Sequence, residues 1–455
     1  MTSDAATVPT ASPAVEAKQD ASYPRTMAWY GVGVFSIVLM FLVLDRGVIN
    51  LLVQPIKRDL HLSDTQMSLL LGAAPVIFYA FIGVPVSRLV DRTVRRALIC
   101  FGVVTWSIMT ALCGVSQNFW QLLLFRVGVG AGESFNAPAT YSMMADMFDR
   151  ERLPRAIAFL NVGFVAGGGI SLIAGGAVIH LLSGVPDLHV PVIGLVHNWQ
   201  LVFFMVGLPG IIAGSLLLTV REPKRRGLKG GAPPKIPLKT VVRYLLTHWR
   251  VYAPMFIGLG LSSIEAAGRA TWGPAFYQRT FGWQPAQIGY TTGLISLACA
   301  PIGLVVGTWL AEHFLKKGQN DGHMRVVALA YTVGIPFSIA GPLMPNAWLA
   351  LAMGAVAGIV GMVSAPSFNA AMQTITPNEM RGQVTALYLF VFSVIGSGIG
   401  PSLVAAVTDY ALPSENLIKY AIAGTAAVMT PLSAAIIWWG VKAYGEAFKR
   451  SKEWY

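Results

Sequence analysis

The chain has 455 residues, of which 55% are hydrophobic and only 12% are charged, and its mean hydropathy is +0.60. A water-soluble domain does not carry so large an apolar fraction, so the composition excludes one and predicts a membrane protein. The net charge of +12 does not require a nucleic-acid partner, because most of the lysines and arginines fall on one side of the predicted spans.

The first 26 residues are rich in Ala, Ser, Thr and Pro, and we expect a disordered tail rather than a cleaved signal peptide. Apolar runs long enough to cross about 30 Å of hydrocarbon follow this tail. The sequence predicts twelve such spans, near residues 28–54, 64–87, 97–116, 119–146, 154–182, 199–220, 251–277, 285–313, 324–343, 346–373, 382–409 and 416–440.

A basic linker rich in Gly and Pro divides the spans into two groups of six. We expect an N-terminal bundle over 27–220, a linker over 221–250, a C-terminal bundle over 251–440 and a tail over 441–455. In the linker, residues 238–250 alternate basic and apolar side chains at helical spacing. They are consistent either with a helix on the membrane surface or with a plain extension of the seventh span.

The distribution of the 33 Lys and Arg residues predicts the orientation of the chain. Most of them lie in the tails and in the loops that share a side with the tails if the chain enters the membrane with its N-terminus inside. Because positive residues are retained on the cytoplasmic side, we expect both termini in the cytoplasm and the protein in a bacterial inner membrane.

The two halves repeat one another in sequence. A shift of 221 matches Gln66 with Gln287, and a shift of about 228 places the segment NAPA (136–139) over SAPS (364–367). Such an echo is typical of transporters built from two related bundles. The second shift also matches Arg126 and Glu133 with glycines, so the halves differ in charge.

Charged residues inside the first and fourth spans are the principal candidates for a functional site. Each charge at mid-membrane costs at least about 2.5–3.5 kcal/mol, so Asp45 and Arg46 require partners. Arg126 and Glu133 lie seven residues apart, close to two turns, which places them on one face of the fourth helix. We expect Arg126 at the level of Asp45 and Arg46, in the outer half of the membrane, and Glu133 about 10 Å further in. We expect the glycines between them to leave room beside that face.

This network of two acids and two bases has two interpretations. It is either a set of ion pairs that only fixes helix packing or, as we favour, a site for proton coupling. An anionic substrate that takes over an arginine leaves an acid without its cation, and that acid then binds a proton more readily. We expect Glu133 first and Asp45 second to carry the proton, with Arg46 and Arg126 binding the anion.

Candidates in the rest of the chain are weaker. Glu265 and Arg269 lie four residues apart in the seventh span, and they form either a self-contained ion pair or part of a substrate site. Asn369 and Tyr79 are further candidate substrate ligands, although each residue type more often makes a packing contact.

An acid lies among four arginines in the loop after the second span. The positive-inside bias accounts for Arg92, Arg95 and Arg96 but not for Asp91. If Asp91 faced the N-terminus of a neighbouring helix and the arginines reached Asp146, these residues would form a latch between the bundles. We therefore expect them to gate the protein rather than to bind substrate.

This loop, SRLVDRTVRR (87–96), resembles the helix 2–3 signature of the major facilitator superfamily, usually Gly-x-x-x-Asp-Arg-x-Gly-Arg-Arg. Ser87 and Val94 replace its two glycines, so the match depends on the charged positions. Within the superfamily, the first five spans look most like the Spinster group. The more specific part of that resemblance is in the fourth span: Arg126, Gly128, Gly130, Gly132 and Glu133. The anion:cation symporters share the charges of the first and fourth spans and are the nearest alternative.

The resemblance implies an all-α membrane protein with twelve helices in two pseudo-symmetric bundles that rock between inward-open and outward-open states, with the latch closed in the latter. It implies a proton-coupled transporter, not an enzyme, for an amphipathic, anionic lipid such as a lysophospholipid or a sphingosine-phosphate-like molecule. The alternatives are a carrier of small organic anions and a membrane sensor that moves nothing. We expect a monomer. We also expect no cofactor or metal, because no nucleotide-binding loop or metal-ligand cluster occurs in the sequence.

Overall fold

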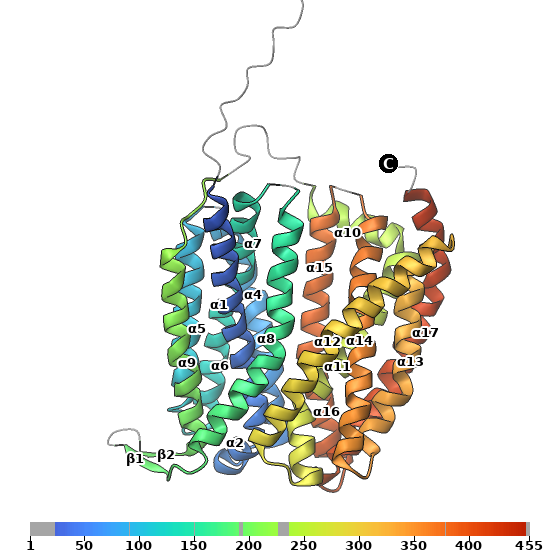
Figure 1. The fold of residues 1–455 in the computed structure, drawn as a ribbon. Helices are drawn as coiled ribbons and strands as arrows, with labels where there is room; N and C mark the ends of the chain where they lie inside the picture. The colour runs from blue at the N-terminus through green and yellow to red at the C-terminus, as the bar shows by residue number, and fades with distance from the viewer. Residues whose placement is uncertain are drawn as a thin grey trace, which may run out of the picture.

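The computed structural model describes residues 23–90, 92–149, 151–190, 194–225, 236–377 and 379–451. Figure 1 shows long helices that run side by side between two faces of the molecule. We call the face where α1 begins and α17 ends the terminal face, and the other, which carries α2 and the strands, the opposite face.

The described residues of the first half form nine α-helices, two short turns of other helix types and two short strands. Its elements are α1 (Arg25–Leu51), α2 (Val53–Leu60), α3 (Asp64–Ser68), η1 (Leu69–Ala73), α4 (Ala74–Val90), α5 (Arg95–Cys113), α6 (Phe119–Glu133), α7 (Asn136–Met147), α8 (Leu153–Leu182), β1 (Leu188–Val190), β2 (Gly194–Val196), α9 (Asn198–Leu216) and η2 (Leu217–Thr219). The two strands pair antiparallel as a small hairpin at the opposite face.

The second half is helical throughout its described part. Its elements are α10 (Leu238–Thr247), α11 (Trp249–Phe281), α12 (Pro285–Lys316), α13 (Gly322–Leu343), α14 (Ala347–Ile375), α15 (Arg381–Ser393), η3 (Val394–Ile399), α16 (Gly400–Ala406), η4 (Val407–Ala411), η5 (Glu415–Leu417) and α17 (Ile418–Ser451). The turns η1, η3 and η4 are wider, π-type turns within otherwise regular helices.

Eleven helical stretches among the described residues are long and apolar enough to cross a membrane. The missing one of the twelve predicted spans is the fourth, which is divided into α6 and α7. Ser134 and Phe135 between them keep helical dihedrals, but Pro138 has no N–H to donate to the carbonyl of Ser134, so the hydrogen-bond ladder is interrupted there. Counting this interrupted span, the predicted twelve-helix architecture is confirmed.

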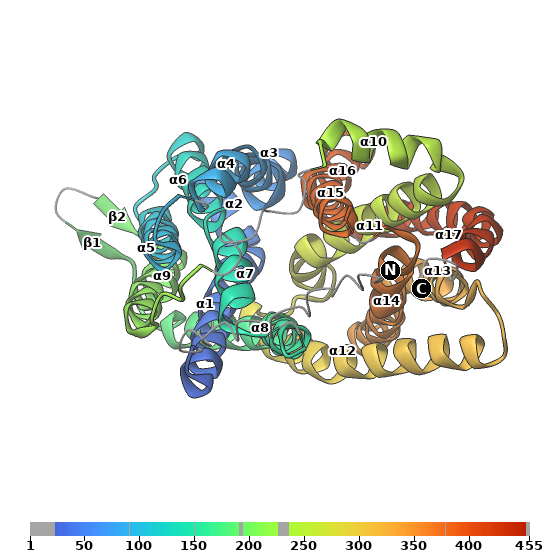
Figure 2. The same cartoon turned by 90° about the horizontal axis from the view of Figure 1, so that it is seen from above.

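The observed ends differ from the predicted ones in three places. A separate helix, α2, follows α1 where the sequence predicted a loop, and α17 continues to Ser451, past the predicted end at residue 440. Residues 238–247 form a helix of their own, α10, which ends at Thr247 just before α11 begins at Trp249, and its place on the membrane surface stays a prediction. Figure 2 shows α10 lying across the terminal face, beside α11 and α15.

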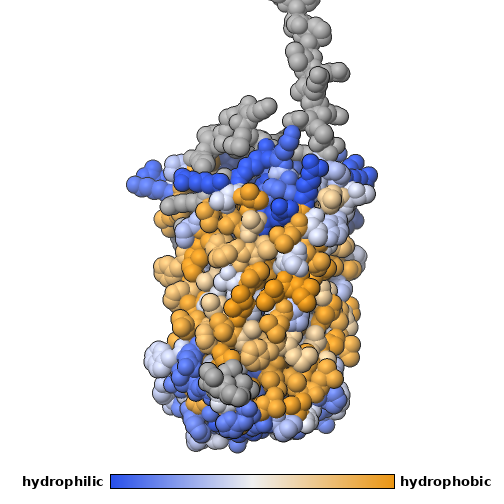
Figure 3. Space-filling model, turned by 90° about the vertical axis from the view of Figure 1, so that its left-hand side faces the viewer, coloured by the Kyte–Doolittle hydropathy of each residue, from blue (hydrophilic) through white to orange (hydrophobic). Residues whose placement is uncertain are grey.

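An apolar belt surrounds the middle of the molecule. In the view of Figure 3, hydrophobic residues form a broad band between two hydrophilic ends. Large apolar side chains on the spans are exposed in the absence of lipid, among them Leu124, Ile212, Val305 and Trp439. An apolar surface of this extent indicates a lipid environment, and the protein is therefore a multi-pass membrane protein.

The halves share one core, and each half also has buried cores of its own. The shared core lies near the opposite face and joins residues such as Ile56 and Trp199 to Trp272, Ile288 and Ile418. A second core, around Trp106, belongs to the first half, and a third, around Tyr444, belongs to the second. The halves are therefore packed together at the opposite face and form separate cores toward the terminal face.

Glycines allow a close crossing between the halves where α8 meets α12. A Cβ atom on Gly293 would lie 2.6 Å from the carbonyl oxygen of Gly169, and one on Gly289 would lie 2.6 Å from that of Leu172. Both distances are too short for any larger residue, so the two backbones are in direct contact.

Candidate functional site

Asp45 and Arg46 point in different directions from α1. Asp45 is buried, with 4% of its surface exposed, whereas 46% of the Arg46 side chain is exposed although it belongs to a membrane span. Neighbouring positions on a helix differ by about 100°, so one charge faces the inside of the first half and the other faces an open space.

Arg46 forms an ion pair with Glu133 at the end of α6. The Nε atom of Arg46 donates to Oε2 and Oε1 of Glu133 at 3.0 and 3.3 Å, and its Nη2 atom also contacts Oε2. Glu133 is only 2% exposed. The ring of Tyr79, a predicted substrate ligand, lies 6.0 Å from the guanidinium carbon of Arg46, within cation–π range.

Arg126 lies about two turns before Glu133 on α6. It is buried, and not all of its nitrogen atoms have a hydrogen-bond partner among the described residues. Its Nε atom donates to the carbonyl oxygen of Leu70 at 3.3 Å, in the wide turn η1, while its Nη1 atom has no hydrogen-bond partner among the described residues. Only 1% of Arg126 is exposed. A buried charge with a free donor is costly, and it calls for an anionic or strongly polar partner.

The second acid of the site, Asp45, has a neutral partner. The hydroxyl of Thr110 on α5 donates to Oδ2 of Asp45 at 3.0 Å. The sequence analysis did not identify Thr110, because a lone threonine in an apolar span carries no signal of its own.

A cavity of ≈ 120 Å³ joins the charged residues of the first half to the second half. Arg46, Arg126 and Glu133 line it from one side, and Thr271 of α11 and Ser397 of η3 line it from the other. The site therefore lies between the halves, where any movement of one half against the other changes its shape.

The glycines of α6 have a different role from the one expected. A Cβ atom on Gly130 would lie 2.3 Å from the carbonyl oxygen of Pro75 in α4, and one on Gly132 would lie 2.7 Å from the backbone nitrogen of Trp106 in α5. The prediction that these glycines leave open room was wrong. They admit neighbouring backbones, which brings α4 and α5 against α6 and holds Arg126 and Glu133 in place.

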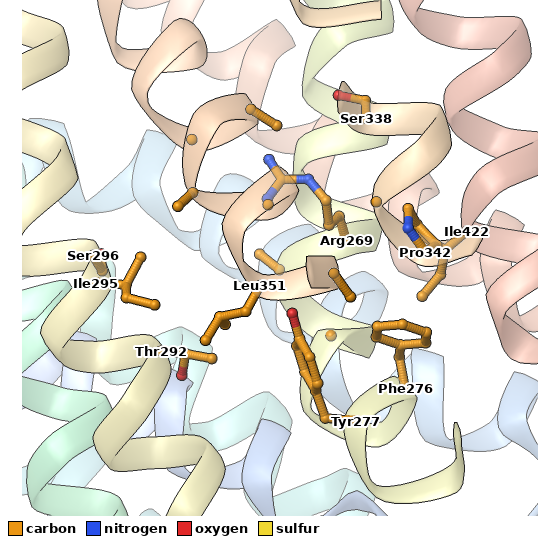
Figure 4. A pocket seen from close by; sticks show the side chains of 18 of the residues that line it. Arg269, Phe276, Tyr277, Thr292, Ile295, Ser296, Ser338, Pro342, Leu351 and Ile422 are labelled. Carbon is orange, nitrogen blue, oxygen red and sulfur yellow. The ribbon is translucent and has the colours of Figure 1, made fainter. Parts of the chain in front are cut away.

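The charged pair of the second half is self-contained. The Nε atom of Arg269 donates to Oε1 of Glu265 at 2.9 Å, one turn away on α11. Arg269 also lines a second, larger cavity of ≈ 300 Å³, into which its side chain projects (Figure 4). Asn369 is exposed, and its amide donates to the carbonyl oxygen of Ala365 in its own helix, so it borders neither cavity.

The predicted gating residues gather at the terminal face. Arg95 is buried and forms ion pairs with Asp146 on α7 and, at 2.9 Å, with Glu222 after α9. Arg96 donates through its backbone nitrogen to Glu222, whereas Arg92 is exposed.

These contacts join elements of the first half to one another. The expected contact of Arg95 with Asp146 is present, but the described partners of Arg95 and Arg96 do not reach the second half. Asp91 lies outside the described residues. The latch between the bundles, implied for the outward-open state, stays a prediction.

A charged cluster that the sequence analysis missed joins the halves at the opposite face. Asp64 of α3 is fully buried and accepts two hydrogen bonds from Arg279 of α11, at 2.6 and 2.7 Å. Lys57 contacts both Asp64 and Glu415. Next to them, Asp409 of η4 accepts hydrogen bonds of 2.7 Å from the backbone nitrogen and the hydroxyl of Thr65.

We call the residues Lys57, Asp64, Arg279, Asp409 and Glu415 the opposite-face cluster. Together with the shared core, this cluster joins the two halves at this end of the molecule. The sequence analysis did not identify this cluster, because its members lie far apart in the chain, near the ends of different helices.

Two six-helix halves around a central polar cavity, inside an apolar belt, define a multi-pass membrane transporter. Residues 35–401 match the family model of the Major Facilitator Superfamily. The chain belongs to this superfamily.

Similar proteins agree with the expected likeness to the Spinster group. The chain is 29% identical to an MFS-type efflux pump of Mycolicibacterium smegmatis over 84% of its own length and 85% of the pump. It is 22% identical to the protein spinster of Drosophila melanogaster over 84% of this chain but only 62% of that protein, which is thus substantially longer.

Solved structures agree on the fold. A bacterial homologue of the human lysosomal transporter Spinster, in an inward-facing, unoccupied conformation, superposes with a TM-score of 0.76 at 23% identity, over 94% of this chain and 98% of that one. A D-xylose-proton symporter superposes with a TM-score of 0.68 at 15% identity, over 90% of this chain and 97% of that one.

Proposed function

We propose that this protein is a proton-coupled secondary transporter of an amphipathic anion, of the class of lysophospholipids or sphingosine-phosphate-like lipids. The observation that carries the proposal is Arg126, a buried guanidinium with a free donor at a cavity that both halves line. A phosphate or carboxylate in that cavity would accept from Arg126 and from Arg46, and both bonds would be charge-assisted. Tyr79, beside Arg46, would complete the wall of the anion site.

Proton coupling follows from the pairing of Arg46 with Glu133. An anion bound to Arg46 competes with Glu133 for the same guanidinium, so Glu133 loses its stabilising cation and binds a proton more readily. Occupancy by substrate and by proton then depend on each other in both directions. Asp45 is the second candidate proton carrier, because its hydrogen-bond partner, Thr110, is neutral and does not balance its charge.

The transport cycle in this proposal is a rocking of the halves about the central cavity. The opposite-face cluster breaks when the cavity opens to that side, and the residues Asp91, Arg92, Arg95, Arg96 and Asp146 close the terminal side in the same state. We assign the terminal face to the cytoplasm of a bacterial cell, as the distribution of basic residues predicts.

A carrier of small organic anions is the second candidate. The polar cavity of ≈ 120 Å³ is small, which suits a compact substrate. The chain is also 25% identical, over 63% of its length and 62% of the relative, to a probable L-galactonate transporter of Escherichia coli. A sensor that binds its ligand without moving it is the remaining alternative.

Uptake into proteoliposomes distinguishes these functions. Purified protein is reconstituted, a pH gradient is imposed, and uptake of a radiolabelled lysophosphatidic acid is compared with that of galactonate. Gradient-dependent uptake of the lysolipid supports the proposal. Uptake of galactonate alone would replace it by the small-anion carrier, and binding without uptake of either would indicate a sensor.

A further inference from the structure

The helix α10 has no role in the site described above. Figure 1 shows it near the ends of the spans at the terminal face, and Figure 2 shows it at the outer edge of the second half, with α11 and α15 on its inner side. The amide of Gln383 on α15 donates to the carbonyl oxygen of Ile236, just before α10, at 2.9 Å. This hydrogen bond attaches the start of the helix to the second half.

One side of α10 packs against the second half. Val241 is fully buried there, and Tyr244 and Leu245 are partly buried beside it. Because consecutive residues of a helix project about 100° apart, these three side chains cover one side of α10 and leave the rest of its surface uncovered.

The uncovered surface is amphipathic. Leu238, Val242 and Leu246 follow one another at intervals of four residues and form an exposed apolar stripe. Lys239 and Arg243 each come one residue later, so they form a basic stripe about 100° further round the helix, on the side directed away from the protein. An apolar stripe beside a basic one is typical of helices that lie in the membrane interface.

The basic side chains have no acidic partner in the linker. Lys239 and Arg243 are exposed, as is Arg250 at the start of α11, and none of the three forms an ion pair with another described residue. The sequence contains no Asp or Glu between Glu222 and Glu265. This part of the chain therefore carries positive charge without a counter-charge of its own, and it attracts an external anion.

A pair of tryptophans marks the level of the membrane interface beside α10. Trp249 follows α10 after one residue, and the centroid of its ring lies 5.7 Å from that of Trp439 on α17. Both side chains are exposed. Since tryptophan is enriched where spans leave the hydrocarbon, the basic stripe of α10 lies at the depth of the lipid headgroups.

We propose that α10, together with Arg250, binds the headgroups of anionic phospholipids in the leaflet at the terminal face, with its apolar stripe in the hydrocarbon. The apolar stripe supplies affinity for the membrane. Each basic residue near the surface adds a preference of about fivefold for anionic over neutral lipid. The inference goes beyond the proposed function, because it does not depend on what the protein transports.

The first test is the depth of α10, measured by fluorescence quenching on the full chain in nanodiscs. In a background without native cysteines, a bimane label is attached at Val242→Cys in the apolar stripe. The control carries the label at Thr240→Cys, an exposed position about 160° away round the helix. Nitroxide groups on lipid acyl chains quench the label on contact, so we expect strong quenching at Val242→Cys and weak quenching at Thr240→Cys.

The second test is headgroup preference, measured with the label at Val242→Cys. Quenching by nitroxide-labelled phosphatidylglycerol is compared with quenching by nitroxide-labelled phosphatidylcholine at a series of mole fractions. The comparison gives the association constant of the anionic lipid relative to the neutral one. We expect a ratio of at least about five, which falls toward one in 1 M salt, where the Debye length is about 3 Å.

A matched pair of double variants locates this preference. Lys239→Gln with Arg243→Gln removes the basic stripe and should lower the ratio by about fivefold. Lys316→Gln with Lys317→Gln removes the same charge from exposed positions at the terminal end of α12 and should leave the ratio unchanged. The salt dependence needs no substitution in the basic stripe, so it tests the preference even if a variant folds poorly.

Three outcomes overturn the inference. Equal quenching at Val242→Cys and Thr240→Cys would show that the apolar stripe of α10 does not lie in the hydrocarbon. A ratio of one before any charge is removed, or the same ratio in both double variants, would show that the basic stripe does not bind anionic lipid.

Discussion

The two halves of the molecule share a fold but use equivalent positions for different chemistry. Arg126 and Glu133 of α6 correspond by the internal repeat to Gly354 and Gly361 of α14. The first pair is buried and charged, whereas the glycines have no heavy atom within 4 Å of their Cβ positions. One half thus presents ion pairs to the centre of the molecule, and the other presents an empty apolar space.

This difference shows how a duplicated fold acquires an amphipathic interior. The backbone plan fixes where side chains meet the central space, and the residue types then decide whether that space attracts a charge or a hydrocarbon. Because the charged residues that line the polar cavity all come from one half, proton and anion would compete for the same few groups. Substitution of the charged residues of the first half, with Glu265 and Arg269 of the second half as controls, tests this difference.

The largest expected effect is that of Glu133→Gln, which removes the acid paired with Arg46. We expect uptake driven by a pH gradient to fall to the level of protein-free liposomes, while exchange without a gradient is largely retained. The reason is that a glutamine cannot take up the proton. The measurement is lysophosphatidic acid flux in proteoliposomes.

The control is Glu265→Gln, which removes the acid of the second half, and gradient-driven uptake should persist there. Equal losses in both variants, or an unaltered pH dependence in Glu133→Gln, would remove the distinction between the halves.

The next effect is that of Arg126→Gln, which makes the first half resemble the second. Truncating one partner of a buried charge-assisted contact costs about 2–5 kcal/mol, so affinity for an anionic ligand should fall at least about thirtyfold. Equilibrium binding in nanodiscs measures it. Arg269→Gln is the matched control and should change affinity much less, and a reversed order of the two variants would contradict the assignment.

A smaller but measurable effect is expected at the opposite-face cluster, where the halves share charges. Asp64→Asn leaves Lys57 and Arg279 without a buried counter-charge, and such losses destabilise a closed interface by about 3–5 kcal/mol. The readout is a cysteine introduced by Ser402→Cys in a background without native cysteines. With Asp64→Asn, this cysteine should react with a membrane-impermeant maleimide at least about ten times faster than with Asp64 present.

The label in this experiment is added from the opposite face. Arg58→Gln is the control, because Arg58 is 80% exposed and its ion pair with Asp59 contributes little. A labelling rate that Asp64→Asn leaves unchanged would show that the cluster does not hold this face closed.

The smallest effect is that of Thr110→Val, which removes the hydrogen bond to Asp45 without changing the shape of the side chain. Such a bond contributes about 0.5–1.5 kcal/mol, so the proton concentration for half-maximal transport should change by about twofold to tenfold. Thr110→Ser keeps the hydroxyl and should behave like the wild type. If both variants behave alike, Asp45 takes no part in the coupling.

Much of this organisation could be predicted from the sequence because it depends on local patterns. The spans follow from apolar length, the duplication follows from a constant shift, and the candidate charges stand out because charges inside spans are costly. The rotation of one helix against another does not follow from such patterns. The sequence placed Asp45, Arg46 and Arg126 at a common level and Glu133 about two turns further in. It did not specify that Arg46 pairs with Glu133 while Asp45 turns to Thr110.

The features that were missed depend on contacts between distant segments. Asp64 and Arg279 are separated by 215 residues, and neither is unusual at the end of its own helix. The glycines of α6 were taken to leave space because their packing partners, Pro75 and Trp106, belong to other helices. The apolar cavity could likewise not be predicted, since its walls come from five helices of the second half and from Leu172 of α8, which are distant in sequence.

The central claim is that substrate and proton compete through Arg46 and Glu133, and the most direct test is to count protons on binding. Lysophosphatidic acid is added to the purified protein in weakly buffered nanodiscs, and proton uptake is followed with a pH indicator dye. The account predicts that the wild-type protein takes up protons as the anion binds and that Glu133→Gln does not. Binding without proton uptake by the wild-type protein, or equal uptake by both proteins, would contradict it.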